Sequence, residues 1–442
     1  MSDSMIVAEV HLWGTLVGHV SWDEITEFAS FEYDQKFLQA PVQLSPLKML
    51  RINRVYVFKE LNRDTFKGLP GMLSDSLPDK FGNALIDVWL AKQGRKANSF
   101  NPIERLCYIG SRGMGALEYK PSQYQGRKSN AIIDLKEMVV LASKILSNRE
   151  KFIENINENN DRQMRQAMTN LLVVGTSAGG ARAKCIIAYD ETTGEVRSGQ
   201  IKATENFTYW LLKLDGIANN KDKELSDPAG YGRIEYAYYL MAKDCGIEMS
   251  ESRLLEENGR AHFMTKRFDR LAGGEKLHMQ SLCAMAHYDF NMAGGYSYEQ
   301  VFDVIRAIVT DNVANVLVEQ FKRAVFNVIG RNQDDHTKNI AFLMDKKGRW
   351  MLSPAFDMTY GYNPDGEWTN RHQMSINDKR NHFVLDDLLQ LAKKADIKQS
   401  KAKTIINEIG QVFLKWKLYA KKATCLKQHE KEINKYLRVN LI

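Results

Sequence analysis

A run of polar residues, NQDDHTKN at 332–339, leads directly into the apolar stretch IAFLM. Asp334 and Asn339 are separated by four residues, which gives the pattern D-x-x-x-x-N. Two β-rich pieces follow, IAFLMD and RWMLSP, joined by the turn-like KKG, and they lead to Phe356 and Asp357. A hairpin of this length would return Asp357 close to Asn339. The spacing therefore predicts two carboxylates and one amide gathered at the mouth of a hairpin.

These residue types suit phosphoryl transfer from Mg-ATP. That reaction needs one carboxylate to orient the attacking hydroxyl or accept its proton, and oxygen ligands that hold Mg²⁺ on the phosphates. Mg²⁺ keeps several waters, so few protein oxygens suffice. Asp334, Asn339 and Asp357 meet this requirement with the spacing of the protein-kinase catalytic loop and metal-binding aspartate. A polar Asn/Asp turn before a hairpin is the alternative interpretation of the same residues.

A kinase also needs groups that bind the nucleotide, and two strand-like segments are candidates. Lys213 lies in TYWLLKLDG, a setting that suits a phosphate-binding lysine, although lysines at strand ends are common. The segment AHFMTKRFDR predicts a hinge strand, where backbone groups from Lys266 through Arg267 to Phe268 would meet the adenine.

A glycine-rich loop, TSAGGARAK at 176–184, is a third candidate. Gly179 and Gly180 permit close backbone approach, and successive N–H groups can form an anion-binding nest. The loop lacks the pattern G-x-x-x-x-G-K-[ST], which disfavours a Walker-type ATPase. Ser177 lies in this loop and is a candidate phosphate acceptor. The alternative is a strained turn without a ligand.

Hydrophobic periodicity predicts a mixed lobe followed by a helical one. Strands are expected in IVAEVHLWG, TLVGHVSW, FEYDQKFL and RINRVYVF, and a helix in KFGNALIDVWLAKQG. Further helices are expected at 134–147 and 161–172 and, beyond His278, in HMQSLCAMAHYD, YSYEQVFDVIRAI and NVANVLVEQFKRAVFNVIG. We expect a β-rich domain at 1–125, a nucleotide-binding core at 126–270 and a helical lobe with the catalytic and metal-binding segments at 271–442.

Composition favours a cytoplasmic protein. The five cysteines are scattered without C-x-x-C spacing, which argues against a disulfide framework or a zinc site. The N-terminus lacks a signal-peptide pattern, and no apolar run approaches the ~18 residues of a membrane helix. The net charge of +7 is concentrated at the end, because 13 Lys and Arg face four acidic residues from Leu391 onward. This excess indicates a solvated helical face or a surface near nucleic acid or an acidic partner.

Together these motifs resemble the HipA family, the serine/threonine-kinase toxins of bacterial type II toxin–antitoxin pairs. GLPGMLSDSLPDKFG and IGSRGMGALEYKP are similar to the family's N-terminal region, and GTSAGGARAK is similar to its phosphate loop, in which a serine precedes G-A-x-x-K. HFMTKRFDR with LHMQSLC resembles the hinge strand and adjoining helix, and NQDDHTKNIAF with LSPAFDM resembles the catalytic and metal-binding segments. The resemblance implies a two-lobed, protein-kinase-like α+β fold with a β-rich N-terminal subdomain and a largely helical C-terminal lobe.

The resemblance also implies a role for individual residues. Asp334 would be the catalytic base, Asn339 and Asp357 would hold Mg²⁺, and Lys213 would contact the phosphates of ATP. Ser177 would be the autophosphorylation site whose modification ejects the loop and switches the kinase off, since a phosphate dianion repels bound ATP. The other nucleotide-binding positions would be Ala178, Gly179, Gly180, Ala181, Lys266, Arg267, Phe268, His336 and Phe356.

Two residues depart from this pattern. Arg182 adds a charge to the phosphate loop where the family usually has an amide. Asp335 directly follows Asp334 and competes with it for the role of base. We favour Asp334, because only this residue keeps the kinase interval to Asn339.

The implied activity is transfer of phosphate to a serine or threonine of another protein, by family analogy an aminoacyl-tRNA synthetase. The implied partners are a helix-turn-helix antitoxin and, through it, operator DNA, with no membrane contact. A kinase-like scaffold that acts as co-repressor with its antitoxin is the main alternative, and an ATP-dependent small-molecule kinase is a third. The joint presence of Asp334, Asn339, Asp357 and Lys213 favours an active kinase, because a scaffold needs none of them.

Overall fold

The computed structural model describes residues 6–91, 93–96, 99–122, 133–147, 182–199, 206–216 and 230–441. The chain divides into two compact units, and two strands, β9 (Ser252–Glu257) and β11 (His278–Ser281), have residues in both. Unit 1 is drawn from 1–45, 49–229 and 255–279, and unit 2 from 46–48, 230–254 and 280–442. The expected helix at 161–172 and the glycine-rich residues 177–181 lie outside the described residues.

The N-terminal sheet of unit 1 has five strands in the order β4-β3-β2-β1-β5. Its strands are β1 (Val7–Leu12), β2 (Thr15–Asp23), β3 (Phe28–Tyr33), β4 (Val55–Tyr56) and β5 (Leu117–Lys120). The β1–β2 turn consists of Trp13 and Gly14, and both have positive φ, 51° and 83°. Two such residues give the turn that matches the twist of paired strands. The expected strand RINRVYVF is reduced to β4, because only Val55 and Tyr56 pair with β3.

Short helices α1 (Arg63–Phe66) and α2 (Gly71–Ser74) precede α3 (Lys80–Ala91) and α4 (Pro102–Ile109). The start of α4 is set by a capping box, in which Asn101 and Glu104 each accept a hydrogen bond from the other's backbone N–H. Pro102 occupies the first helical turn, where no N–H is required.

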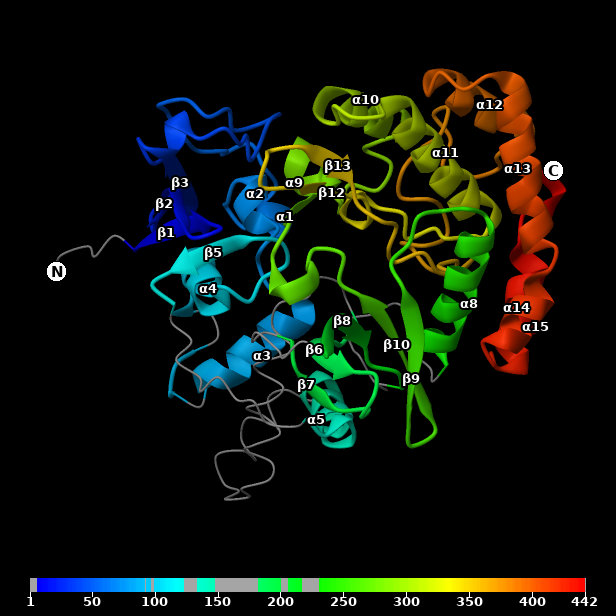
Figure 1. Ribbon diagram of the computed structural model, residues 1–442, viewed down its shortest axis with the longest axis horizontal. Coiled ribbons are helices and arrows are strands. Elements are labelled where there is room, and N and C mark those ends of the chain that lie inside the picture. Colours follow the sequence, from blue (N-terminus) through cyan, green and yellow to red (C-terminus); the bar gives the residue numbers. More distant parts are fainter. Residues whose placement is uncertain are drawn as a thin grey trace. The chain divides into compact units, whose positions relative to one another are not determined.

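A second sheet of unit 1 has the order β7-β6-β8-β10-β9. Its strands are β6 (Lys184–Asp190), β7 (Val196–Ser198), β8 (Phe207–Lys213), β9 (Ser252–Glu257) and β10 (Arg260–Lys266). Helices α3 and α5 (Leu135–Ser147) lie beside it in Figure 1, and their apolar side chains share one core with β6 and β8. Phe81 of α3, Met138 of α5 and Trp210 of β8 are members of that core. The expected helix at 134–147 is therefore confirmed as α5.

The residues after β10 form a buried ion cluster in unit 1. Asp269 accepts hydrogen bonds from the guanidinium of Arg267 (2.6 and 2.8 Å), from that of Arg270 (2.7 Å) and from the backbone N–H of Gly115 (2.7 Å). Both guanidiniums also donate to the carbonyl of Gly113. The cluster therefore fixes the glycine-rich segment that precedes β5 against the end of β10.

Unit 2 is largely helical. Its α-helices are α8 (Tyr231–Asp244), α9 (Leu282–Ala286), α10 (Tyr298–Ile308), α11 (Val313–Ile329), α12 (Leu385–Lys394), α13 (Gln399–Phe413), α14 (Trp416–Lys422) and α15 (Lys427–Tyr436). A three-stranded sheet, β11-β12-β13, contains β11 (His278–Ser281), β12 (Ala341–Met344) and β13 (Trp350–Leu352). No helix among the described residues is long and apolar enough to cross a membrane.

The predicted hairpin after Asn339 is confirmed, with Phe342 opposite Leu352 and Met344 opposite Trp350. The prediction of a helix throughout HMQSLCAMAHYD is wrong, because its first residues form β11. The helix begins only at Leu282, since the Ser281 hydroxyl accepts the N–H of Ala284 and caps it there.

We predict that Asp269→Asn destabilises unit 1 by about 3–5 kcal/mol, because it leaves two buried guanidiniums without their carboxylate. The interaction with the guanidiniums overcomes burial and holds the pKa of Asp269 well below its usual range. The stabilisation is therefore complete above the unfolded pKa of about 3.9 and is lost as the pH falls below it. Native-state hydrogen exchange of β10 measures the loss.

The matched control is Glu27→Gln, which removes a 54% exposed carboxylate of unit 1 that is paired with Arg63. Exposed ion pairs contribute at most about 1 kcal/mol, so exchange should hardly change. Equal protection of β10 in wild type and Asp269→Asn would show that the cluster does not stabilise unit 1.

Candidate active site

The polar loop of residues 332–339 lies between α11 and β12 in unit 2. Helix α11 ends at Ile329, and Arg331, with φ of 56°, turns the chain out of the helical path. A short 3₁₀ turn, Thr337–Asn339, then leads into β12. The side-chain Nδ2 of Asn339 donates to the backbone carbonyl of Asp334 at 2.8 Å. The interval from Asp334 to Asn339 thus closes on itself, and the Oδ1 atom of Asn339 takes no part in that bond.

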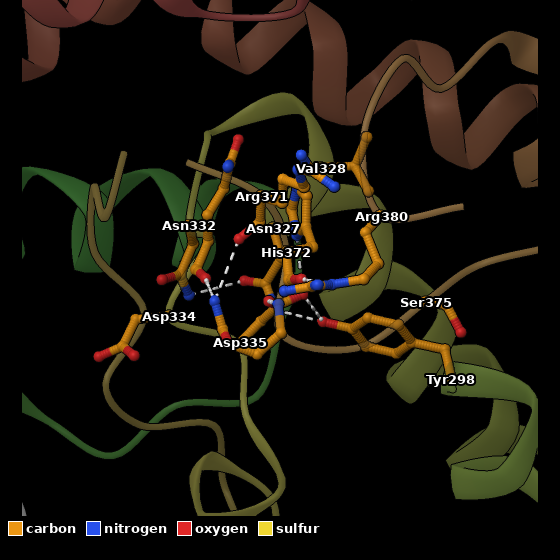
Figure 2. A network of polar contacts seen from close by, with 12 residues as sticks. Tyr298, Asn327, Val328, Asn332, Asp334, Asp335, Arg371, His372, Ser375 and Arg380 are labelled. Carbon is orange, nitrogen blue, oxygen red and sulfur yellow. Dashed lines mark hydrogen bonds and ion pairs between the residues drawn. The ribbon is translucent and has the colours of Figure 1, made fainter. Parts of the chain in front are cut away.

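The two adjacent aspartates have different surroundings. The carboxylate of Asp334 is 47% exposed and accepts a hydrogen bond from the indole Nε1 of Trp368 at 2.7 Å. His336 Nε2 lies 3.8 Å from the same carboxylate. The side chain of Asp335 is only 1% exposed. Figure 2 shows the Asp334 carboxylate directed away from the polar network that encloses Asp335.

Asp335 is satisfied on all sides by hydrogen-bond donors. Its Oδ2 lies 2.9 Å from the hydroxyl of Tyr298 and 2.8 Å from His372 Nδ1, and its Oδ1 accepts the backbone N–H of Gln373 at 2.7 Å (Figure 2). Asn327 of α11 donates to the Tyr298 hydroxyl at 2.9 Å and so extends the network. Burial alone would raise the pKa of Asp335, but the interactions with His372, Gln373 and Tyr298 outweigh it and lower the pKa. Asp335 is thus an anchored anion, and this supports Asp334 as the base.

The metal-binding candidates lie at the same end of the hairpin. Asn339, His336 and Phe356 line one cavity together with Asn332. Asp357 directly follows Phe356, and its carbonyl oxygen is 3.5 Å from Asn332 Nδ2. Asp357 has a positive φ of 52°, a conformation that persists only where the surroundings enforce it. The structure therefore brings the hairpin's two ends together, as the spacing predicts.

This cavity offers amide oxygens to a cation, although Arg323 also lines it and Asp357 does not. Asn332 Oδ1 is buried without a hydrogen-bond partner among the described residues, and Asn339 lines the same cavity. The described residues contain no cluster of three His, Cys, Asp or Glu side chains able to hold a metal ion. A sparse set of hard oxygens is the kind of site that Mg²⁺ occupies when substrate phosphates and waters supply its other ligands.

Lys213 lies at the end of β8 in unit 1, and it is buried. The strand register places Lys184, the first residue of β6, directly opposite Lys213. Residues paired in this way project to the same face of a sheet, so two buried ammonium groups lie on one face. A pair of ammonium groups suits an anion, and phosphate binding by Lys213 stays a prediction. The sequence reasoning missed Lys184, although it is the closing lysine of the glycine-rich loop.

Two of the predicted hinge residues, Lys266 and Arg267, are bonded within unit 1. The backbone N–H of Arg267 donates to the carbonyl of Tyr209 at 2.9 Å, and its guanidinium is bound to Asp269. Lys266 pairs with Trp210 across β8 and β10. Contacts with adenine at Lys266, Arg267 and Phe268 stay a prediction, as do all the predicted site roles. Ser177, Ala178, Gly179, Gly180 and Ala181 lie outside the described residues.

Comparison with known proteins identifies the class of this chain. Its α+β fold matches that of a solved complex from Shewanella oneidensis, described as the toxin–antitoxin system HipA, HipB and its operator DNA. The TM-score is 0.63, with 16% identity over 97% of this chain and 94% of that one. Residues 8–120 match the HipA N-terminal domain, and residues 176–416 match the HipA-like C-terminal domain. The chain belongs to the HipA family.

One curated relative also matches. It is the putative kinase Y4mE of Sinorhizobium fredii, 24% identical over 137 residues, which cover 29% of this chain. The chain spans only 32% of the length of that relative. The N-terminal match ends with β5, and the C-terminal match ends at the start of α14, so α15 and the last residues follow the matched region.

We predict that Asp335→Asn lowers the free energy of unfolding of unit 2 by about 3–5 kcal/mol. The new amide would point an N–H at groups that already donate, and a buried network would be broken. Asp334→Asn should cost less than about 1 kcal/mol, because that side chain is half exposed. Thermal denaturation of the two isosteric variants measures the difference. A larger loss of stability in Asp334→Asn would contradict the assignment of Asp335 as the anchored carboxylate.

Proposed function

We propose that this protein is an Mg-ATP-dependent serine/threonine kinase that phosphorylates another protein. The observation that carries the proposal is the difference between the two adjacent aspartates of the loop. The side chain of Asp335 is buried and hydrogen-bonded. The side chain of Asp334 is half exposed, with Trp368 bonded to its carboxylate and Asn339 to its backbone carbonyl. A general base must reach the hydroxyl that it deprotonates, so an exposed and oriented carboxylate suits this role. A scaffold would gain nothing from fixing one carboxylate so that it faces solvent.

The other groups take complementary roles. Asn339 Oδ1 and the carboxylate of Asp357 hold Mg²⁺, which neutralises charge on the phosphates when it is bound. Lys213, together with Lys184, binds phosphate oxygens at the end of the β6–β8 pair. His336 and Phe356 line the nucleotide side of the cavity that contains Asn339.

Autophosphorylation at Ser177 switches the kinase off in this proposal. Ala178, Gly179, Gly180 and Ala181 cradle the ATP phosphates through backbone N–H groups, and a phosphate dianion on Ser177 would repel that ligand. The protein substrate proposed by family analogy is an aminoacyl-tRNA synthetase. The rival function is a co-repressor scaffold that does not turn over ATP, and phosphate transfer distinguishes the two.

The proposed partners are a helix-turn-helix antitoxin and, through it, operator DNA. The similar Shewanella oneidensis structure contains HipB and operator DNA. The tail of this chain provides suitable charge, because all 12 lysines from Leu391 onward are exposed. Clustered exposed lysines attract phosphate without sequence specificity, so they would strengthen a complex whose antitoxin reads the operator.

We predict that Asp334→Asn abolishes phosphate incorporation at Ser177 in the presence of Mg-ATP, with a rate loss of at least ~10²-fold, the scale of general-base catalysis. The wild type should gain phosphate on the peptide that contains Ser177. Intact-mass and peptide mass spectrometry measure both, and Ser177→Ala locates the modification.

The matched control is Asp365→Asn, which neutralises an exposed aspartate in a turn of the same unit. It should incorporate phosphate as the wild type does. Measurable ATP binding without any phosphate transfer in the wild type would eliminate the kinase and leave the co-repressor scaffold.

We predict that the purified chain binds a 20-base-pair duplex of arbitrary sequence in a salt-dependent manner through the tail. Replacing Lys421 and Lys422 of α14 with glutamine should weaken binding at low salt and reduce the slope of log K against log salt by up to about 2. Replacing Lys346 and Lys347, an adjacent exposed pair in the β12–β13 turn, is the control. Fluorescence anisotropy measures both, and equal slopes would remove the tail from the DNA-binding surface.

A further inference from the structure

The single arginine of the basic tail behaves unlike its lysines. Arg438 follows α15 and is only 7% exposed, whereas every lysine from Leu391 onward is exposed. It also lies beyond residue 416, where the match to the HipA-like C-terminal domain ends. A buried cation needs partners that replace its hydration, so its contacts identify what it does.

The guanidinium of Arg438 bonds to the end of α11, to the polar loop and to the segment that contains His372. Nη1 donates to the carbonyl of Val328 at 3.2 Å and to His372 Nε2 at 2.8 Å. Nη2 donates to Gln333 Oε1 at 3.2 Å and also to the side-chain oxygen of Asn381. Figure 2 shows Val328 and His372 close together in this network.

The backbone reinforces this attachment. The N–H of Arg438 donates to the carbonyl of Ile329, the last residue of α11, at 3.0 Å. In return, Arg331 Nε donates to the carbonyl of Tyr436 at 2.7 Å, and Arg331 Nη1 donates to Gln333 Oε1 at 3.1 Å. The C-terminal segment is therefore bonded to the chain on the N-terminal side of Asp334.

The contact with His372 also fixes the chemistry of that residue. Arginine offers only donors, so His372 Nε2 must be the acceptor and the proton must lie on Nδ1. Nδ1–H then donates to Asp335 at 2.8 Å, and the imidazole is neutral. Burial, offset in part by Asp335, lowers the pKa of His372 and favours the same neutral state.

Asp334 is thus held between two anchored neighbours. Gln333 precedes it and is bound by Arg438, and Asp335 follows it and is bound by His372, whose orientation Arg438 sets. Each anchor includes a bond set by one guanidinium, whose flat fork contacts several acceptors at once. Gln333 is also held by Arg331 and by the Thr369 carbonyl, and Asp335 by Tyr298 and Gln373, so loss of Arg438 loosens the loop without releasing it.

We propose that Arg438 is a positioning residue for phosphoryl transfer: the C-terminal segment orients the loop that carries Asp334. The proposal rests on the kinase function proposed above. Reacting groups must be held closely, and a displacement of about 1 Å costs about 10²-fold in rate. Loss of Arg438 therefore lowers kcat, and KM for ATP changes less, because the phosphate-binding lysines belong to β6 and β8 and only His336 and Asn339 lie in this loop.

The test compares Arg438→Met, Arg438→Lys and wild type in ATP-dependent phosphorylation. We expect kcat to fall by about 10- to 100-fold in the methionine variant. The lysine variant should be intermediate, because an ammonium group keeps the charge but lacks the fork that joins His372 to Gln333. Lys431→Met, which removes an exposed charge from α15, should keep the wild-type kcat.

A folded Arg438→Met with wild-type kcat would overturn the proposal. If that variant does not fold, the lysine variant decides: a lowered kcat at an unchanged melting temperature supports the positioning role, and a wild-type kcat refutes it.

Hydrogen exchange of residues 332–339 separates this proposal from the kinase function itself. Faster exchange in Arg438→Met than in Lys431→Met shows that the tail holds the loop, whether or not ATP is turned over. An inactive wild type with this exchange pattern would refute the kinase function but not the attachment of the loop by Arg438. Unchanged exchange together with an active wild type would refute only the claim that Arg438 holds the loop.

Discussion

The fold of unit 2 around the polar loop depends on one buried charge, the carboxylate of Asp335. A carboxylate removed from water is tolerated only when donors replace its hydration. Those donors come from the first turn of α10, through Tyr298, and from the segment that contains His372 and Gln373. None of them is a sequence neighbour of Asp335. The charge is therefore satisfied only when these segments have assembled, so the position of the loop is a property of the tertiary fold.

The same constraint explains how two adjacent aspartates come to differ. With Asp335 held inside, the Asp334 carboxylate is directed to the other side, where Trp368 donates to it and water reaches it. Asn339 then closes the loop through the carbonyl of Asp334, which fixes the backbone rather than the carboxylate. The carboxylate stays accessible while the backbone that carries it is held at three successive residues. A general base requires that combination of access and orientation.

Sequence reasoning succeeded where the information was local. The interval from Asp334 to Asn339, the hairpin after it and helix α5 follow from spacing and periodicity within about 25 residues, and the fold class and family were confirmed. The helix expected from His278 failed because the Ser281 cap, a single local hydrogen bond, sets a later start. His372 and Arg438 could not be found, since their roles arise from contacts between distant segments. Lys184 could have been found as the lysine that closes the glycine-rich loop.

The two units bury a carboxylate in different ways. In unit 1, Asp269 contacts two guanidiniums directly, so its charge is compensated at contact distance. In unit 2, the neutral imidazole of His372 stands between Asp335 and the guanidinium of Arg438, so the compensating charge lies one residue further away. An imidazole in that position also fixes the orientation of the groups that it joins, because its single proton must face the carboxylate when the arginine occupies the other nitrogen. A lysine could supply the charge, but its three N–H donors on one nitrogen atom cannot serve the four acceptors, which are the Val328 carbonyl, His372, Gln333 and Asn381. This geometric requirement accounts for one buried arginine in a tail whose other basic residues are exposed lysines.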